Sequence, residues 1–134
     1  MEITDLMIGD WVKIIHHHKP KPSIKVKKID LNDFHDALLQ VYPEITYEPI
    51  PLTTEILEKS GFEPIRQDAE EPYYWQFFDK EEGHVINAFR RIYRGLWIEC
   101  SNATTETSVN KQCEYVHELQ HALKLCGIEK EIVL

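Results

Sequence analysis

The sequence lacks any long run of apolar residues. No stretch approaches the ~18–20 consecutive apolar residues that a membrane-spanning helix needs, so no membrane partner is expected. The first ten residues carry acids where a secretory signal carries lysines, and no export is expected. Only three cysteines occur, with no C-x-x-C spacing, and these are Cys100, Cys113 and Cys126. Reduced thiols are the simplest interpretation, and the sequence predicts a cytoplasmic protein.

The common signatures of catalysis are also missing. The chain contains no glycine-rich phosphate loop and no G-x-S-x-G motif, and no cysteine is placed beside a catalytic histidine. The carboxylates within 68–71 and 79–82 fall in turn-rich segments, where we expect them to be solvated. No cofactor is therefore predicted. Whether the protein is an enzyme stays uncertain, with a non-enzymatic role favoured.

The chain has 134 residues, 43% of them hydrophobic and 28% charged, which is typical of a soluble globular protein with its own core. Its net charge of −8 disfavours nucleic acid as a partner, but residues 11–29 hold six lysines and no acid. This segment makes nucleic acid a possible partner. The candidate phosphate contacts are Lys19, Lys21, Lys25, Lys27 and Lys28, with Arg90, Arg91 and Arg94 as further candidates.

The N-terminal part is predicted to be β-rich. Residues 10–16 and 23–30 read as a hairpin with a lysine-rich loop, and the Gly-Asp before the first strand is similar to the start of many small SH3-like barrels. The apolar spacing over 30–43 then predicts a helix, and 46–52 is expected to be extended. A short helix follows within 53–62, with Thr53 as its N-cap and Gly61 in the left-handed position after its end.

The C-terminal part is predicted to be α+β. Residues 73–79, 84–93 and 96–101 are expected to form a three-stranded antiparallel meander. A loop at 102–110 and the longest helix at 111–127 follow, and 130–134 could add an edge strand. The predicted fold is thus α+β, a β-rich N-terminal part followed by a meander packed with two helices. The chain divides into subdomains 1–50 and 51–134, or forms one compact domain.

The sequence HELQH at 117–121 matches H-E-x-x-H, the zinc-hydrolase pattern of two histidines and a glutamate base. His117 and His121 would share a helical face, but the helical wheel directs that face away from the apolar stripe around Leu119, to solvent. A third zinc ligand would have to come from upstream, such as His84 or His35. The interpretation that we favour is that both histidines are exposed and that Glu118 is solvated. His117 and His121 are therefore only weak candidates for metal ligands, and no metal site is predicted.

Two further patterns have a structural interpretation that we favour. The histidine run at 16–18 offers at most two ligands on one side of a strand, so a functional metal is not expected there. The aromatic residues of 73–79 and 84–93 alternate with arginine, as in a nucleic-acid-binding sheet. The same aromatics are the natural core of a small sheet, and we expect core packing.

Two segments carry a resemblance. YEPIPLTTEILEKSGF (47–62) and CEYVHELQHALKLCG (113–127) resemble signatures of a group of small uncharacterised proteins of gut anaerobic bacteria, often encoded by prophages and other mobile elements. That group implies no activity. Its pattern usually has Asn at the position of His121 and often Gln at that of Glu118, which implies that the zinc motif is not part of the signature.

The predicted function is a non-enzymatic accessory or protein-interaction protein of a phage or mobile element, with an unknown protein partner. A nucleic-acid-binding accessory protein that uses the lysine-rich 13–28 hairpin is the alternative. A zinc hydrolase built on His117, Glu118 and His121 is the least favoured hypothesis.

Overall fold

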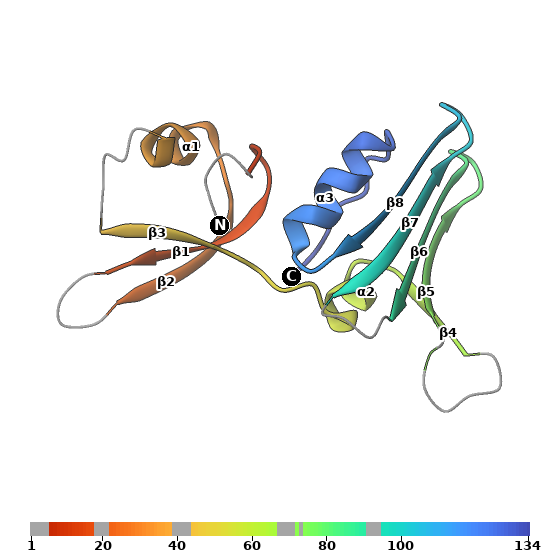
Figure 1. The fold of residues 1–134 in the computed structure, drawn as a ribbon, viewed down its shortest axis with the longest axis horizontal. Helices are drawn as coiled ribbons and strands as arrows, with labels where there is room; N and C mark the ends of the chain where they lie inside the picture. Colours follow the sequence, from red (N-terminus) through yellow and green to blue (C-terminus); the bar gives the residue numbers. More distant parts are fainter. Residues whose placement is uncertain (1–5, 18–21, 39–43, 67–71, 73, 91–94) are drawn as a thin grey trace. The chain divides into compact units, whose positions relative to one another are not determined.

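The computed structural model describes residues 6–17, 22–38, 44–66, 72, 74–90 and 95–134. It is an α+β structure, rich in β-strands, with a three-stranded and a five-stranded antiparallel sheet and three short helices (Figure 1). The chain divides into two compact units, Met1–Ile50 and Pro51–Leu134. No helix in the described ranges is long and apolar enough to cross a membrane.

The described residues of the N-terminal unit form one sheet and one helix. Its sheet has the antiparallel order β2-β1-β3, and the elements are β1 (Trp11–His16), β2 (Ser23–Lys28), α1 (Leu31–Leu38) and β3 (Ile45–Pro49). The predicted hairpin is confirmed, with Ile14 opposite Lys25 in the register. In the described part of this unit the strands form an open sheet and not the SH3-like barrel considered from the sequence.

One face of this sheet forms the core of the unit. Val12 and Ile14 alternate with more exposed neighbours along β1, because successive side chains of a strand point to opposite faces. They pack with the other core side chains, Leu6, Ile29, Phe34, Ile45 and Tyr47. Phe34 comes from α1, so the helix covers this face. The other face carries the exposed apolar side chains of β2, Ile24 and Val26.

Helix α1 begins with a reciprocal cap. Asp30 Oδ1 accepts the backbone N–H of Asp33 at 2.8 Å, and Asp33 Oδ2 accepts the backbone N–H of Asp30 at 3.1 Å. These bonds satisfy donors that a helix start leaves without intrahelical partners. The helix agrees with the predicted start, and residues 39–43 of the predicted span lie outside the described residues.

Helix α2 (Thr54–Lys59) confirms the predicted capping in detail. Thr53 Oγ1 accepts the N–H of Ile56 at 3.3 Å. At the other end Gly61 has φ +93°, and the N–H of Phe62 bonds to the carbonyl of Leu57 at 3.0 Å. This is the Schellman ending, and Phe62 is buried, as its hydrophobic contact requires.

The five-stranded sheet of the C-terminal unit is larger than the predicted meander. Its order is β4-β5-β6-β7-β8, and its strands are β4 (Glu63–Ile65), β5 (Tyr74–Asp79), β6 (His84–Arg90), β7 (Leu96–Asn102) and β8 (Thr107–Cys113). The three predicted strands are the three central ones. The two added strands lie at the edges, where exposed polar side chains give the sequence little apolar periodicity.

Strand β8 corrects two predictions. The segment 102–110 was expected to be a loop, and the helix was expected to start at 111. The chain instead turns back at Glu106, which has φ +55°, and pairs with β7 as far as Cys113. Helix α3 therefore spans only Val116–Leu125. The edge strand considered at 130–134 is not formed.

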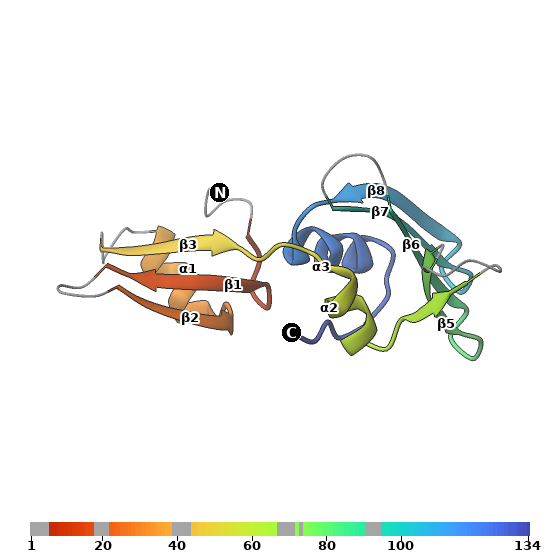
Figure 2. The same ribbon diagram turned by 90° about the horizontal axis from the view of Figure 1, so that it is seen from below.

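Helices α2 and α3 lie on the same side of the five-stranded sheet (Figures 1 and 2). The sheet buries the alternate side chains Trp75, Ile86, Ala88, Ile98 and Cys100 on this side. From α3 come Val116, Leu119, Ala122 and Leu123, all buried. The predicted apolar stripe around Leu119 is thus the stripe that meets the sheet.

Candidate functional site

The glutamate of the HELQH motif holds the start of its own helix. Glu118 Oε1 accepts the backbone N–H groups of Glu114 and Tyr115, each at 3.0 Å. Lys111 Nζ lies 3.9 Å from the other carboxylate oxygen. A carboxylate in the first turn is also stabilised by the positive end of the helix dipole. Glu118 is therefore a capping residue in this structure, and the expectation of a merely solvated acid is wrong.

The histidines of the motif do not both point to solvent. His117 is only 6% exposed, and its ring stacks on Tyr115 with the centroids 5.9 Å apart and the planes 9° from parallel. His121 meets His117 edge-on at 5.5 Å. The prediction of solvent exposure is wrong for His117 because the helix starts five residues later than expected. Tyr115 is extended, with φ −123° and ψ 154°, and its ring lies against His117.

Among the residues that the structure describes, no third zinc ligand joins the two histidines. Within the described ranges there is no group of three or more His, Cys, Asp or Glu side chains suited to a metal ion. His84 lies in a pocket beside Gly127, at the opposite end of α3 from His117. His35 belongs to the N-terminal unit. With Glu118 engaged in capping, the contacts of this motif are those of a helix start.

Lys25, Lys27 and Lys28, the candidate lysines that the structure describes, lie on two faces of the sheet. Lys25 and Lys27 pair across the strands with Ile14 and Val12, and so lie on the face that α1 covers. Lys28 pairs with Trp11, and its ammonium lies 5.5 Å from the centroid of the indole ring. These three lysines therefore do not form one basic surface. Two of the candidates, Lys19 and Lys21, lie outside the described residues.

Lys27 is held by the acids at the start of α1. Its ammonium lies 2.7 Å from Asp33 Oδ2 and 3.4 Å from Asp30 Oδ2. The hydrogen bond to Asp33 raises the pKa of Lys27. The pKa of Asp30 is lowered, chiefly by its hydrogen bond from the backbone of Asp33 and also by Lys27. The charge of Lys27 is therefore largely balanced within the N-terminal unit.

Strand β2 exposes apolar side chains at the edge of its sheet. Ile24 is 65% exposed and Val26 is 45% exposed. In the described part of the chain β2 pairs with β1 alone, so one side of its backbone faces away from the sheet. Lys25, between the two, is exposed on the opposite face. An edge strand with these side chains offers both backbone and side-chain contacts to a partner.

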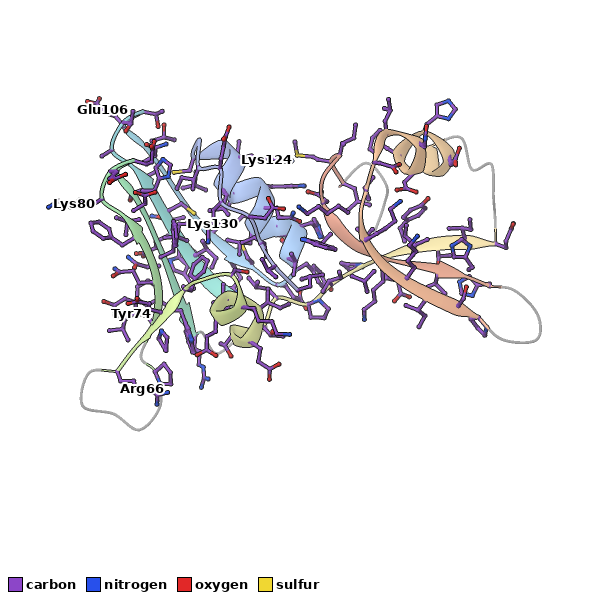
Figure 3. The ribbon with its side chains drawn as sticks, turned by 180° about the vertical axis from the view of Figure 1, so that it is seen from behind. Arg66, Tyr74, Lys80, Glu106, Lys124 and Lys130 are labelled. Atoms are coloured by element: carbon purple, nitrogen blue, oxygen red, sulfur yellow. The ribbon has the colours of Figure 1, made fainter. Side chains whose placement is uncertain are left out.

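The aromatic residues of the larger sheet divide between its two faces. Trp75 is 1% exposed and belongs to the core, as predicted. Tyr74, labelled in Figure 3, and Phe89 stack with their centroids 5.3 Å apart on the face away from α3. Arg90 does not join them, because its guanidinium lies 5.1 Å from the ring centroid of Trp75. Arg91 and Arg94 lie outside the described residues.

The C-terminal unit also contains a pocket of about 400 Å³. Three segments form it: the turn between β5 and β6, the turn between β7 and β8, and the residues that follow α3. Its charged lining comes from Asp79, Glu82, His84, Glu129 and Lys130, beside Phe77 and Ile128. Sequence reasoning missed this site because its walls are distant in sequence, and each acid alone looks like an ordinary turn residue.

These features define a β-rich α+β protein whose candidate sites are an exposed edge strand and a charged pocket. Comparison of the chain with protein-family models, with curated proteins and with solved structures finds no match in any of the three.

Proposed function

We propose that the protein is a non-enzymatic interaction protein that binds an extended segment of a partner protein along β2. The supporting observation is the exposed edge of this strand, with Ile24 and Val26 65% and 45% exposed. An edge strand recruits a peptide by backbone hydrogen bonds, while alternate side chains provide selectivity. An accessory role in a prophage or mobile element, which the resemblance implies, is part of this proposal.

The side chains of β2 define the chemistry of the partner. An added strand would place every second side chain beside Ile24 and Val26, where apolar residues fit. The intervening side chains would lie beside Lys25, where acids fit, and each favourable cross-strand pair contributes about 0.2–1 kcal/mol. The lysines also disfavour pairing of β2 with a second β2, because like charges would become neighbours. The expected partner is a strand that alternates apolar and acidic residues.

Nucleic acid remains the alternative prediction and has less support. The ammonium of Lys27 is already balanced by Asp33 at 2.7 Å, and Lys28 lies on the opposite face from Lys25. The affinity of a protein for nucleic acid rises with the number of its cations that contact phosphates of the same molecule. The zinc hydrolase has no supporting contact among the described residues.

The test uses the whole protein and three octapeptides. In the first peptide valine alternates with glutamate, and in the second valine alternates with lysine. The third peptide has the same residues as the first in scrambled order. Binding is measured by titration with NMR detection of the backbone amides of Ser23–Lys28. The valine–glutamate peptide should bind best and shift these amides. Lys25→Glu should reverse the preference toward the valine–lysine peptide, by up to about fivefold for one charge pair. Lys59→Glu, in α2, is the matched control and should change nothing.

Equal binding of all three peptides, or no shift in β2, would overturn the proposal. Labelled single-stranded DNA and RNA are titrated in parallel. Binding of these strands that weakens steeply with salt, without binding of the peptides, would replace the proposal with the nucleic-acid alternative.

A further inference from the structure

The charged pocket of the C-terminal unit has a fixed frame. Asn102 is buried, and its amide nitrogen donates to the carbonyls of Cys126 at 3.0 Å and Gly127 at 3.2 Å. Its amide oxygen accepts the N–H of Thr104 at 3.1 Å. Thr104 Oγ1 in turn donates to the carbonyl of Glu82 at 2.9 Å. Asn102 and Thr104 therefore tie all three walls together, and the pocket exists before any ligand arrives.

The carboxylate wall is also held in place. Asp79 Oδ1 accepts the backbone N–H groups of Glu81 at 3.1 Å and Glu82 at 3.2 Å. The second oxygen of Asp79 has no such bond to the turn within the described residues. Asp79 pairs across the strands with His84, so both side chains lie at the same end of the sheet. Glu82 and Glu129 line the pocket from its exposed edge.

Lys130, in the segment that follows α3, also lines the pocket. Its ammonium lies 4.3 Å from the ring centroid of Phe77. Within the described residues no ion pair of 4.0 Å or less joins this ammonium to Asp79, Glu82 or Glu129. The Lys130 ammonium and the pocket carboxylates therefore line one pocket without pairing, and a ligand that carries both charges can bind between them.

The pKa of Lys130 agrees with an ammonium that has no carboxylate beside it among the described residues. Burial lowers the pKa of Lys130, since the ammonium gives up solvation without gaining a carboxylate. A ligand carboxylate would supply the missing negative partner.

We infer that this pocket binds a free amino acid, with the ligand carboxylate at Lys130 and the ligand ammonium at Asp79. The volume is within the range of small-molecule pockets, and Phe77 and Ile128 offer apolar contact to the side chain. Three carboxylates against one lysine leave the lining negative, so a basic amino acid binds better than an acidic one. A metal ion is disfavoured, because the described acids and His84 do not converge into a metal-binding group. This inference is independent of the function proposed for β2.

The experiment titrates the whole protein with L-lysine, L-alanine and L-glutamate at millimolar concentrations, and with propylamine and propionate as single-charge fragments. Amide shifts of Thr104 and Thr105 in the wild-type protein report occupation of the pocket. The amino acids should bind at least about tenfold more tightly than either fragment, because the two charged contacts act together. Lysine should bind best and glutamate worst.

Two variants test the charged walls. Lys130→Met keeps an apolar stem on Phe77, and Asp79→Asn keeps the oxygen that caps the turn, so both should fold. Each should weaken binding of L-lysine about tenfold, the size of one charge-assisted contact. The matched controls are Lys80→Met and Glu81→Gln, on the exposed side of the same hairpin, and both should bind as the wild type does.

Several results would overturn the inference. These are the absence of shifts at Thr104 and Thr105 with every amino acid, binding of propylamine as tight as that of L-lysine, or unchanged binding in both charge variants. The first two of these results are read from amide shifts of the wild-type protein, so they can be decided even if a variant fails to fold.

Discussion

Replacement of Glu118 distinguishes a helix cap from a catalytic base. Its Oε1 accepts two backbone N–H groups at 3.0 Å, and its side chain is 25% exposed. Loss of a capping side chain costs about 0.5–2 kcal/mol. Loss of the carboxylate at the helix start removes about 0.3–1 kcal/mol more. Glu118→Ala should therefore reduce the free energy of unfolding by about 2 kcal/mol, the sum of the middle values.

Glu118→Gln separates the two contributions. The amide oxygen can still accept the N–H groups of Glu114 and Tyr115, while the charge is lost. This variant should cost only about 0.3–1 kcal/mol. For a catalytic base the order of effects differs, because glutamine would abolish activity with little effect on stability.

The assay is urea unfolding followed by tryptophan fluorescence in a Trp11→Phe background. The remaining tryptophans, Trp75 and Trp97, both belong to the C-terminal unit, so the signal reports the unit that contains α3. Glu81→Ala, an exposed glutamate in a turn, is the control and should change little. Equal stability of Glu118→Ala and wild type would refute the capping role. One equivalent of zinc in untagged protein would restore the hydrolase hypothesis.

Three further outcomes follow from the structure. Burial raises the pKa of the Cys100 and Cys113 thiols to about 12. Both thiols should resist a thiol-specific reagent at pH 8 and react fully in urea, and rapid labelling of the native protein would contradict their burial. The free energy of unfolding should fall as pH rises above about 9, because there only the thiols of the unfolded protein ionise. A Cβ on Gly95 would lie 2.1 Å from the carbonyl oxygen of Cys113, whereas one on Gly9 would meet nothing within 4 Å, although both residues have positive φ. Gly95→Ala should cost more than about 4 kcal/mol and Gly9→Ala about 1–2 kcal/mol in urea unfolding, and similar costs would refute the steric argument. Thr53→Ala should cost about 1 kcal/mol, and circular dichroism that shows no loss of stability would exclude the cap on α2.

Local signals in the sequence predicted the helix ends and the central strands. Thr53 and Gly61 bounded α2 correctly because caps depend on side chains and φ values within one turn of the helix. The central strands were predictable because their buried side chains alternate, as in Leu96, Ile98 and Cys100. The edge strands β4 and β8 were missed because they bury few side chains, and the seven residues of β8 include only two apolar ones, Val109 and Cys113.

The site residues depended on contacts that the sequence does not display. The helical wheel assumed a helix from 111, and the start at Val116 changed the surroundings of His117. The exposed edge of β2 follows from its place in the sheet order, which its alternating sequence leaves open. The pocket combines Asp79, Asn102 and Lys130, which lie on three segments, so their proximity is a property of the fold alone.

The sequence by itself determined the α+β class, the hairpin of the N-terminal unit, the limits of α2 and the apolar stripe of α3. These depend on periodicity and capping, which act over a few residues. The tertiary structure decided what each polar residue contacts. Glu118 caps the start of its helix, Lys27 pairs with the acids of α1, and Lys130 lies over the ring of Phe77. Such contacts depend on the register and order of the strands, and these arise only when distant segments pair.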